Sequence, residues 1–209
     1  MIVIVNYGLG NLGSILNMLK RIGIDNVIIS NDPDMLLKAD KLILPGVGAF
    51  DAGMQKINSS GLLAALNEAV CIKKTPVLGI CLGMQLMTQC SEEGQLKGLG
   101  WIDAEVKRFQ FANTEFKIPH MGWNYVTTTD VKLSTALPEQ PKFYFVHSYF
   151  ITCHQATDII MTCNYGGNFV AGFCKDNIMG VQFHPEKSHK YGMSLLKYFI
   201  ENFKSVTGS

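Results

Sequence analysis

A cysteine flanked by two glycines is the most reactive arrangement in this 209-residue chain. Cys81 lies in Val77-Leu78-Gly79-Ile80-Cys81-Leu82-Gly83, between a short apolar run and a stretch that we expect to begin a helix near Leu82. A G-x-C-x-G segment at a strand-to-helix turn is the cysteine counterpart of the nucleophile elbow. Such a turn strains the backbone at the nucleophile, and the helix N-terminus favours the thiolate. We therefore predict that Cys81 is a nucleophile; the alternative is a buried structural thiol, as we expect for the other five cysteines.

A histidine and a glutamate near the C-terminus could serve that nucleophile. His184 and Glu186 follow the apolar run 178–183 and are two residues apart. Pro185 favours an extended backbone at His184, which would place both side chains on one side of the segment. A carboxylate can then hold Nδ1–H of the imidazole and leave Nε2 facing the thiol. The competing interpretation is a surface His-Pro turn with a solvated glutamate.

A glycine-rich loop could complete the reaction site. Residues 44–50, Leu-Pro-Gly-Val-Gly-Ala-Phe, follow a predicted strand. A tetrahedral intermediate needs two N–H donors for its oxyanion. The backbone N–H of Leu82 is one candidate, and that of Val47, between two glycines, is the other. A Gly-x-Gly loop is otherwise an ordinary turn.

The elements that must position these residues predict an α/β fold. Short apolar runs at 2–5, 27–29, 42–44 and 77–80 alternate with helical periodicity at 12–22, 62–70 and after position 82. We expect a single open, mostly parallel twisted sheet with helices on both faces. Residues 1–209 are predicted to form one domain.

The second half of the chain has a different pattern. Aromatic and β-branched runs separated by turn residues predict antiparallel hairpins, and the stretch 195–200 predicts a closing helix. The polar stretch 110–115 is expected to be a loop. The runs that we expect to be strands are 143–146, 149–153, 159–163, 169–173 and 178–183.

Composition narrows the functional class. The formal net charge is +1 and no long basic run occurs, which argues against nucleic acid or an anionic membrane as partner. No apolar run is long enough for a membrane span, and residues 1–5 resemble a strand rather than a signal peptide. The five histidines and six cysteines show no metal-ligand spacing, so we predict neither metal nor cofactor. A reducing cytoplasm fits these features.

Several segments together resemble a known family. Besides the three described above, they are Asn6-Tyr7-Gly8-Leu9-Gly10-Asn11-Leu12, Pro119-His120-Met121-Gly122-Trp123-Asn124 and Phe145-Val146-His147-Ser148-Tyr149. Their order is similar to that in class I (triad) glutamine amidotransferases, and within that family to the glutaminase subunits of imidazole glycerol phosphate synthases. The resemblance covers almost the whole chain.

This resemblance implies a substrate, a partner and roles for individual residues. L-Glutamine would be hydrolysed through a thioester on Cys81, with His184 and Glu186 completing the triad and the Val47 and Leu82 amides forming the oxyanion hole. Ammonia would pass through a (β/α)8-barrel cyclase subunit, bound as a heterodimer, to make imidazole glycerol phosphate for histidine synthesis. Glutamine would be held by Gly48, Gln85, Glu93, Ser148 and Tyr149, with Glu93 facing its ammonium group; the partner would be contacted by Asn11, Met121, Trp123, Asn124 and Lys187.

A second ammonia acceptor stays open. The family usually has aspartate where this chain has Asn6, and the helix at 13–21 also resembles paralogous subunits associated with surface-polysaccharide genes. Those subunits are thought to supply ammonia to a sugar-modifying amidotransferase.

Three other interpretations come from different classes of protein. Gly8, Gly10 and Gly13 form G-x-G-x-x-G after the first predicted strand, and Asp32 lies ~20 residues further on, as in a dinucleotide-binding domain. That interpretation leaves the Cys/His/Glu set unexplained. A free-standing cysteine hydrolase would act without a partner, and an inactive interaction subunit would have no need of all three residues.

Overall fold

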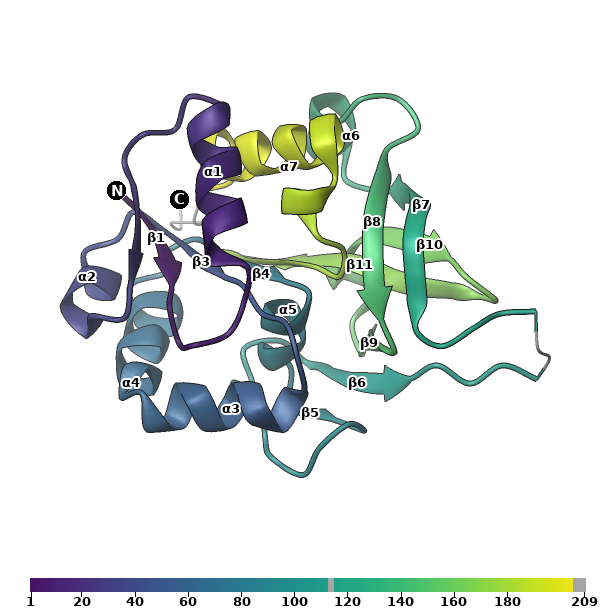
Figure 1. Cartoon of the computed structure of the whole chain (residues 1–209), viewed down its shortest axis with the longest axis horizontal. Coiled ribbons are helices and arrows are strands. Elements are labelled where there is room, and N and C mark those ends of the chain that lie inside the picture. Colours follow the sequence, from purple (N-terminus) through teal and green to yellow (C-terminus); the bar gives the residue numbers. More distant parts are fainter. Residues whose placement is uncertain (113–114, 205–209) are drawn as a thin grey trace.

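Twelve strands form one mixed sheet within residues 1–112 and 115–204, the part of the chain that the computed structural model describes (Figure 1). The strands are β1 (Ile2–Val5), β2 (Val27–Ser30), β3 (Lys41–Leu44), β4 (Val77–Ile80), β5 (Cys90–Ser91), β6 (Ala104–Arg108), β7 (His120–Thr128), β8 (Lys142–His147), β9 (Tyr149–Cys153), β10 (Ile159–Asn164), β11 (Asn168–Lys175) and β12 (Ile178–Val181). The helices are α1 (Leu12–Arg21), α2 (Pro33–Leu37), α3 (Phe50–Ser59), α4 (Leu62–Asn67), α5 (Leu82–Leu86), α6 (Val131–Ala136) and α7 (His189–Glu201). A π-helical segment η1 (Glu68–Ile72) follows α4, and η2 (Ala156–Asp158) and η3 (Pro185–Lys187) are 3₁₀ turns.

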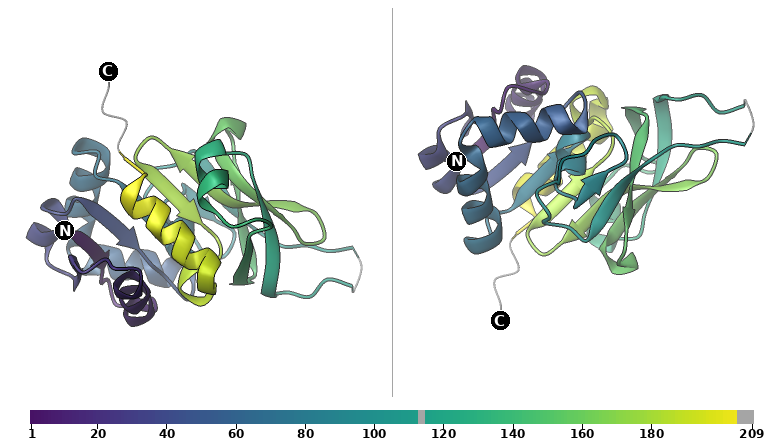
Figure 2. Two further views of the ribbon diagram at one scale, coloured as in Figure 1. Left: turned by 90° about the horizontal axis from the view of Figure 1, so that it is seen from above. Right: turned by 90° about the horizontal axis from the view of Figure 1, so that it is seen from below.

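The inner strands β1, β3 and β4 of the parallel half are buried on both faces, as their apolar runs predict. The order of this half is β2-β1-β3-β4-β12, and every neighbouring pair in it is parallel. Side chains alternate: Ile2 and Ile4 pack with α1 and α7, whereas Val3 and Val5 pack with α3 and α4. Figure 2 shows α7 crossing one face of the sheet and α3 crossing the opposite face. The predicted α/β class is confirmed.

The antiparallel half continues from β12 through β11, β10, β7 and β8. β9 pairs with β11 of the main sheet and also with β6. β6 and β9 thus form a branch beside the main sheet. β12 belongs to both halves, because it forms a hairpin with β11 and also lies parallel to β4. The expected strand at 178–183 is shorter than predicted and ends at Val181, two residues before Phe183.

Some elements have no counterpart in the sequence prediction. The helices α2, α3 and α6, the strands β5 and β6, and the nine-residue β7 lie in stretches where we predicted no element. In α3 the buried residues Phe50, Gly53, Met54 and Ile57 nevertheless recur at helical spacing. The loop expected at 110–115 falls partly on positions 113 and 114, which lie outside the described residues. Within those residues, no helix is long and apolar enough to cross a membrane.

Two glycines allow β4 to turn sharply into α5. A Cβ on Gly83 would lie 1.8 Å from the backbone oxygen of Leu44, and one on Gly79 would lie 2.8 Å from the backbone of Met84. Neither position has room for a side chain. The elbow glycines are therefore required by close packing of α5 against β3 and β4.

Gly83→Ala should destabilise the fold, because the Leu44 carbonyl cannot move without disturbing β3. We expect a loss of more than about 2 kcal/mol in the free energy of unfolding. Gly13→Ala is the matched control: Gly13 lies in α1, and outside its chain neighbours and the backbone of that helix no described atom comes within 4 Å of the added Cβ. Alanine there should be neutral or stabilising by up to ~1 kcal/mol. Urea unfolding of both variants checks this, and equal stability of the two would contradict it.

Candidate functional site

Cys81 occupies a strained position at the junction of β4 and α5. Its backbone has φ 53° and ψ −110°, in the positive-φ region that non-glycine residues rarely adopt. Its N–H donates to the Val181 oxygen at 2.8 Å, which ties the turn to the end of β12. The elbow predicted for residues 77–83 is thus the observed geometry.

His184 and Glu186 lie just past β12, next to that turn. Nδ1 of His184 donates to Oε1 of Glu186 at 2.8 Å, and both side chains are only 2% exposed. The extended backbone at His184 (φ −101°, ψ 97°) matches the expectation from Pro185. Nε2 of His184 and Oε2 of Glu186 are buried without a hydrogen-bond partner in the described structure. Nε2 therefore remains available for a proton from Cys81.

The backbone around His184 is also held firmly. Its N–H donates to the Tyr144 oxygen at 2.9 Å, and the Ser188 hydroxyl donates to the His184 oxygen at 2.6 Å. The same Ser188 hydroxyl accepts from the Tyr144 N–H at 3.0 Å. These bonds connect the end of β12 to β8 and limit movement of the imidazole.

The charges of the site favour a protonated imidazole. Burial alone would lower the pKa of His184, but the nearby sulfur of Cys81 and the hydrogen bond and charge of Glu186 outweigh it and raise that pKa to about 10. A protonated His184 beside Cys81 places a proton donor next to the sulfur. The arrangement can therefore deliver a sulfur nucleophile and return a proton to a leaving group.

Cys81 and His184 face a cavity of about 340 Å³, which is large enough for an amino-acid substrate. Cys81, His184, Val47 and Leu82 lie on its wall, as do all five residues predicted to hold glutamine. The complete lining is Val47, Gly48, Cys81, Leu82, Gln85, Glu93, Pro119, Val146, His147, Ser148, Tyr149 and His184.

A chain of amide contacts supports the cysteine from behind. Nε2 of Gln182 donates to Sγ of Cys81 at 3.7 Å, and Oε1 of Gln182 accepts from Nε2 of Gln85 at 3.0 Å. Nε2 of Gln85 also donates to the Tyr149 oxygen at 3.2 Å. With both amide hydrogens of Gln85 engaged, its Oε1 is the atom left to accept from a substrate.

The glycine loop after β3 is anchored by a buried tyrosine. The Tyr7 hydroxyl donates to the Pro45 oxygen at 2.5 Å, and a Cβ on Gly46 would lie 2.6 Å from that hydroxyl. Burial, reinforced by Cys81, raises the pKa of Tyr7 well above its usual value, so the hydroxyl remains a donor. Gly48 has φ 110°, which orients the next peptide as few other residues could. Val47 between them is 41% exposed.

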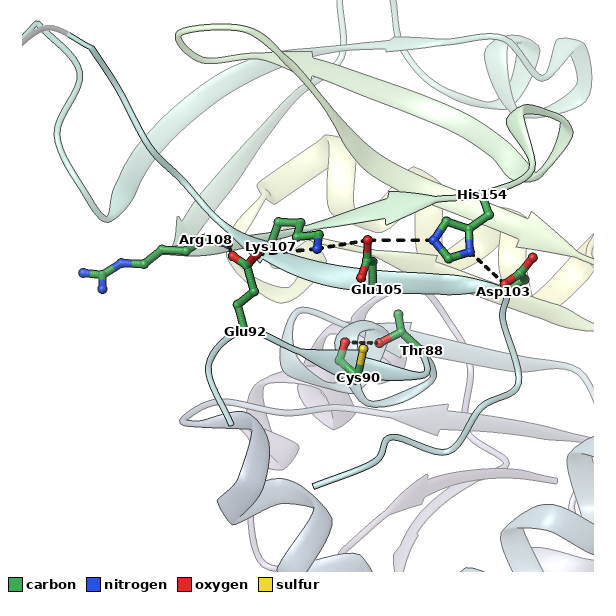
Figure 3. A network of polar contacts seen from close by, with 8 residues as sticks. All are labelled: Thr88, Cys90, Glu92, Asp103, Glu105, Lys107, Arg108 and His154. Atoms are coloured by element: carbon green, nitrogen blue, oxygen red, sulfur yellow. Dashed lines mark hydrogen bonds and ion pairs between the residues drawn. The ribbon is translucent and has the colours of Figure 1, made fainter. Parts of the chain in front are cut away.

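Glu93 is held by the loop between β5 and β6. Its Oε2 accepts from the Phe50 N–H at 2.8 Å at the start of α3, and its N–H donates to Ser91 Oγ at 3.1 Å. Neighbouring Glu92 accepts from the Arg108 N–H at 2.8 Å and pairs with Lys107, which also pairs with Glu105 (Figure 3). These ion pairs are solvent-exposed and stabilise little by themselves. The carboxylate-to-backbone bonds are what position Glu93.

Four of the five residues predicted to meet a partner are exposed, and Asn124 is the exception. Asn11 and Lys187 are exposed and follow β1 and β12, while Met121 is 61% and Trp123 is 39% exposed on β7. Asn124 is half-buried. Trp123 stacks on His189 with ring centroids 5.4 Å apart, and Lys187 lies over the Tyr144 ring.

Sequence reasoning did not identify several residues of the site. Tyr7 was only part of a longer matched segment and Gln182 only part of the run 178–183, and no role was predicted for Pro119, Val146 or His147. Hydrogen bonds between residues far apart in sequence define these contributions, such as Tyr7 to Pro45 and Gln182 to Cys81. A polar residue inside an otherwise buried run, as at Gln182, is the one signal that could have pointed to them.

Comparison with known proteins identifies the class of protein that this geometry defines. The family model for glutamine amidotransferase class-I matches residues 3–203. Two solved structures share the fold: a glutamine amidotransferase, with a TM-score of 0.73 at 18% identity over 95% of this chain and 97% of that chain, and the glutaminase domain of Trypanosoma brucei CTPS with bound acivicin, with a TM-score of 0.66 at 16% identity over 99% and 97%. The chain belongs to the class I glutamine amidotransferase family.

Curated relatives narrow the comparison within that family. The chain is 56% identical to imidazole glycerol phosphate synthase subunit HisH 2 of Methanococcus maripaludis, over 96% of this chain and 99% of that protein. It is 50% identical to the subunit of the same name from Pseudomonas aeruginosa, over the same shares. The predicted family resemblance is therefore confirmed.

The family match and the local structure both argue against the dinucleotide-binding interpretation. Asp32 caps its own helix, since its Oδ1 accepts from the Asp34 N–H at 2.9 Å. A Cβ on Gly10 would lie 3.1 Å from Pro45, so Gly10 gives room for the glycine loop. Of the three glycines in the G-x-G-x-x-G pattern, Gly10 is the one that close packing requires.

Glu186→Gln should lower the pKa of His184, because it removes a buried negative charge while keeping a carbonyl acceptor for Nδ1–H. NMR titration of the imidazole measures this, with Glu201→Gln, on the exposed end of α7, as the control. The wild-type pKa of about 10 exceeds the unfolded value of ~6.5. Protonated His184 therefore contributes fully to the free energy of unfolding below about pH 6.5, and this contribution is lost as the pH rises toward 10.

The stability difference between wild type and Glu186→Gln should accordingly shrink between pH 6.5 and 9.5. Urea unfolding at both pH values checks the sign. An unchanged His184 titration in the variant would mean that Glu186 does not stabilise the imidazolium.

Proposed function

We propose that this chain is the glutaminase subunit of an imidazole glycerol phosphate synthase. The observation that carries the proposal is the buried Cys81–His184–Glu186 arrangement on a cavity of amino-acid size. Membership of the amidotransferase family and 56% identity to a HisH subunit support the substrate and the assembly. We further infer that residues 1–209 act as a single amidotransferase domain.

The reaction begins with attack of Cys81 on the side-chain amide of glutamine. Sγ bonds to the amide carbon, and His184 carries the thiol proton on Nε2. The tetrahedral intermediate collapses as that proton passes to the departing nitrogen, which leaves as ammonia. Water, deprotonated by His184, then attacks the thioester and releases glutamate, while Sγ recovers a proton or the imidazolium pair.

The surrounding residues have matching roles in this proposal. The N–H of Leu82, in the first turn of α5, has no acceptor within its own helix and stabilises the oxyanion together with the N–H of Val47. Glu93 faces the substrate ammonium with the carboxylate that also caps α3. Gly48, Gln85, Ser148 and Tyr149 hold the rest of the glutamine.

The partner in this proposal is a (β/α)8-barrel cyclase subunit that receives the ammonia. It docks on Asn11, Met121, Trp123, Asn124 and Lys187, where exposed apolar side chains concentrate on β7. We place the complex in the cytoplasm, because six unpaired cysteines suit a reducing compartment. A sugar amidotransferase is the second possible acceptor.

Cys81→Ala and Cys81→Ser should both abolish glutamine hydrolysis without unfolding the chain, since neither adds volume at the elbow. Ammonia release measured at saturating glutamine checks this, with Cys90→Ser, an exposed cysteine, as the active control. Glu186→Ala should cost less than loss of Cys81, on the order of 10²- to 10⁴-fold in kcat. Turnover retained in both Cys81 variants would refute the nucleophile.

The chain alone should hydrolyse glutamine slowly and should be accelerated by its partner, because the Gly46–Gly48 loop can leave the oxyanion hole incomplete until docking. Mixing the chain with the candidate cyclase subunit, with and without the imidazole precursor, tests this. Full activity alone would favour a free-standing hydrolase. Stimulation by a sugar amidotransferase instead would redirect the ammonia to that acceptor.

A further inference from the structure

Two buried histidines lie beside the cavity without a role in the mechanism. His120 on β7 and His147 on β8 are direct cross-strand partners in the antiparallel pair, and they are 3% and 6% exposed. Their rings meet edge to face, with Nδ1 of His120 3.0 Å from Nε2 of His147. Only His147 lines the cavity.

The hydrogen bonds of the pair allow one arrangement of protons. Nδ1 of His147 lies 2.7 Å from the Tyr149 carbonyl oxygen, which can only accept, so that nitrogen carries the proton. Burial lowers the pKa of His147 to about 3 and that of His120 to about 4, so both rings are neutral near pH 7. Nε2 of a neutral His147 must then accept, and Nδ1 of His120 must donate to it.

The chain of bonds continues on the far side of His120. Its Nε2 accepts from the Asn124 side-chain amide at 3.4 Å, and the same amide donates to the Asn164 oxygen at 2.9 Å. Aromatic rings fix the His120 plane: Tyr165 stacks on it with centroids 4.0 Å apart and Phe145 at 4.8 Å. Every hydrogen bond in this chain therefore points the same way from donor to acceptor: from Asn124 to His120, from His120 to His147, and from His147 to the Tyr149 oxygen.

This order of donors and acceptors excludes His147 as a second base for Cys81, because its only lone pair is already engaged. Its other bond has a direct consequence for the substrate cavity. The Tyr149 carbonyl accepts from both His147 and Gln85, and Gln85 continues through Gln182 to the sulfur of Cys81. A change at His120 would thus reach the wall that binds glutamine.

We propose that His120 is a positioning residue for glutamine binding, acting through His147 on the Tyr149 wall of the cavity. It touches neither substrate nor nucleophile. The inference rests on the proposed glutaminase function. Without the Nδ1–H of His120, the lone pair of His147 is buried unsatisfied, and the wall can relax toward another arrangement.

Paired substitutions at His120 test this in the full-length chain. His120→Leu removes the donor, whereas His120→Asn keeps an amide N–H near the position of Nδ1. We expect His120→Leu to raise KM for glutamine by about 5- to 100-fold, the range for a buried unsatisfied acceptor, with kcat within about twofold. His120→Asn should recover KM to within about threefold of wild type. His154→Leu, a histidine in the exposed network of Figure 3, is the control and should leave both constants unchanged.

A normal KM in His120→Leu, or equal impairment of the two variants, would overturn the proposal. If His120→Leu does not fold, imidazole ¹⁵N NMR of the wild type decides it: both rings should be Nδ1–H tautomers that do not titrate between pH 5 and 8. An Nε2–H proton on either ring would overturn it. A wild-type chain that fails to hydrolyse glutamine even with a partner would instead refute the proposed function, while the NMR result still judges the histidine pair.

Discussion

The parallel pairing of β4 with β12 is the constraint on which the site depends. Its register places Ile80 opposite Val181, so both strands end at the same edge of the sheet. Cys81 follows one strand directly and His184 follows the other by three residues, which closes a gap of about a hundred residues in sequence. A slip by one residue would reverse which side chains face each layer of the core, and burial on both faces therefore fixes the register.

That constraint explains which parts of the architecture were predictable from sequence. Alternating apolar strands and helical periodicity indicated the parallel half because both faces of β1, β3 and β4 are buried. The glycines of the elbow were informative for a similar reason, since at Gly83 only a missing side chain fits. These features are local, and local sequence determines them.

Other parts depend on pairings that a single sequence does not specify. The run 178–183 is equally typical of a hairpin strand and of a central parallel strand, and β12 is both. The nine-residue β7 was missed because its outward face carries Met121, Trp123 and Tyr125, so that the usual contrast between apolar and polar faces is reduced. The bonds of Tyr7 and His147 likewise follow from tertiary contacts.

The site also requires energetically costly features that the surrounding fold must stabilise. The positive φ at Cys81 costs on the order of 1–3 kcal/mol, and a buried carboxylate oxygen of Glu186 has no hydrogen-bond partner among the described residues. Charges in such surroundings are tolerated only where packing prevents their escape to solvent. Here β4 and β12 lie centrally in the sheet, with α7 and α5 against them. β7 has a different relation to the cavity, because its inner face carries His120 and Asn124 while its outer face carries the exposed apolar residues of the proposed docking surface. A displacement of this one strand would therefore affect both the proposed docking surface and the hydrogen bonds that His147 and Gln85 make to Tyr149 at the cavity.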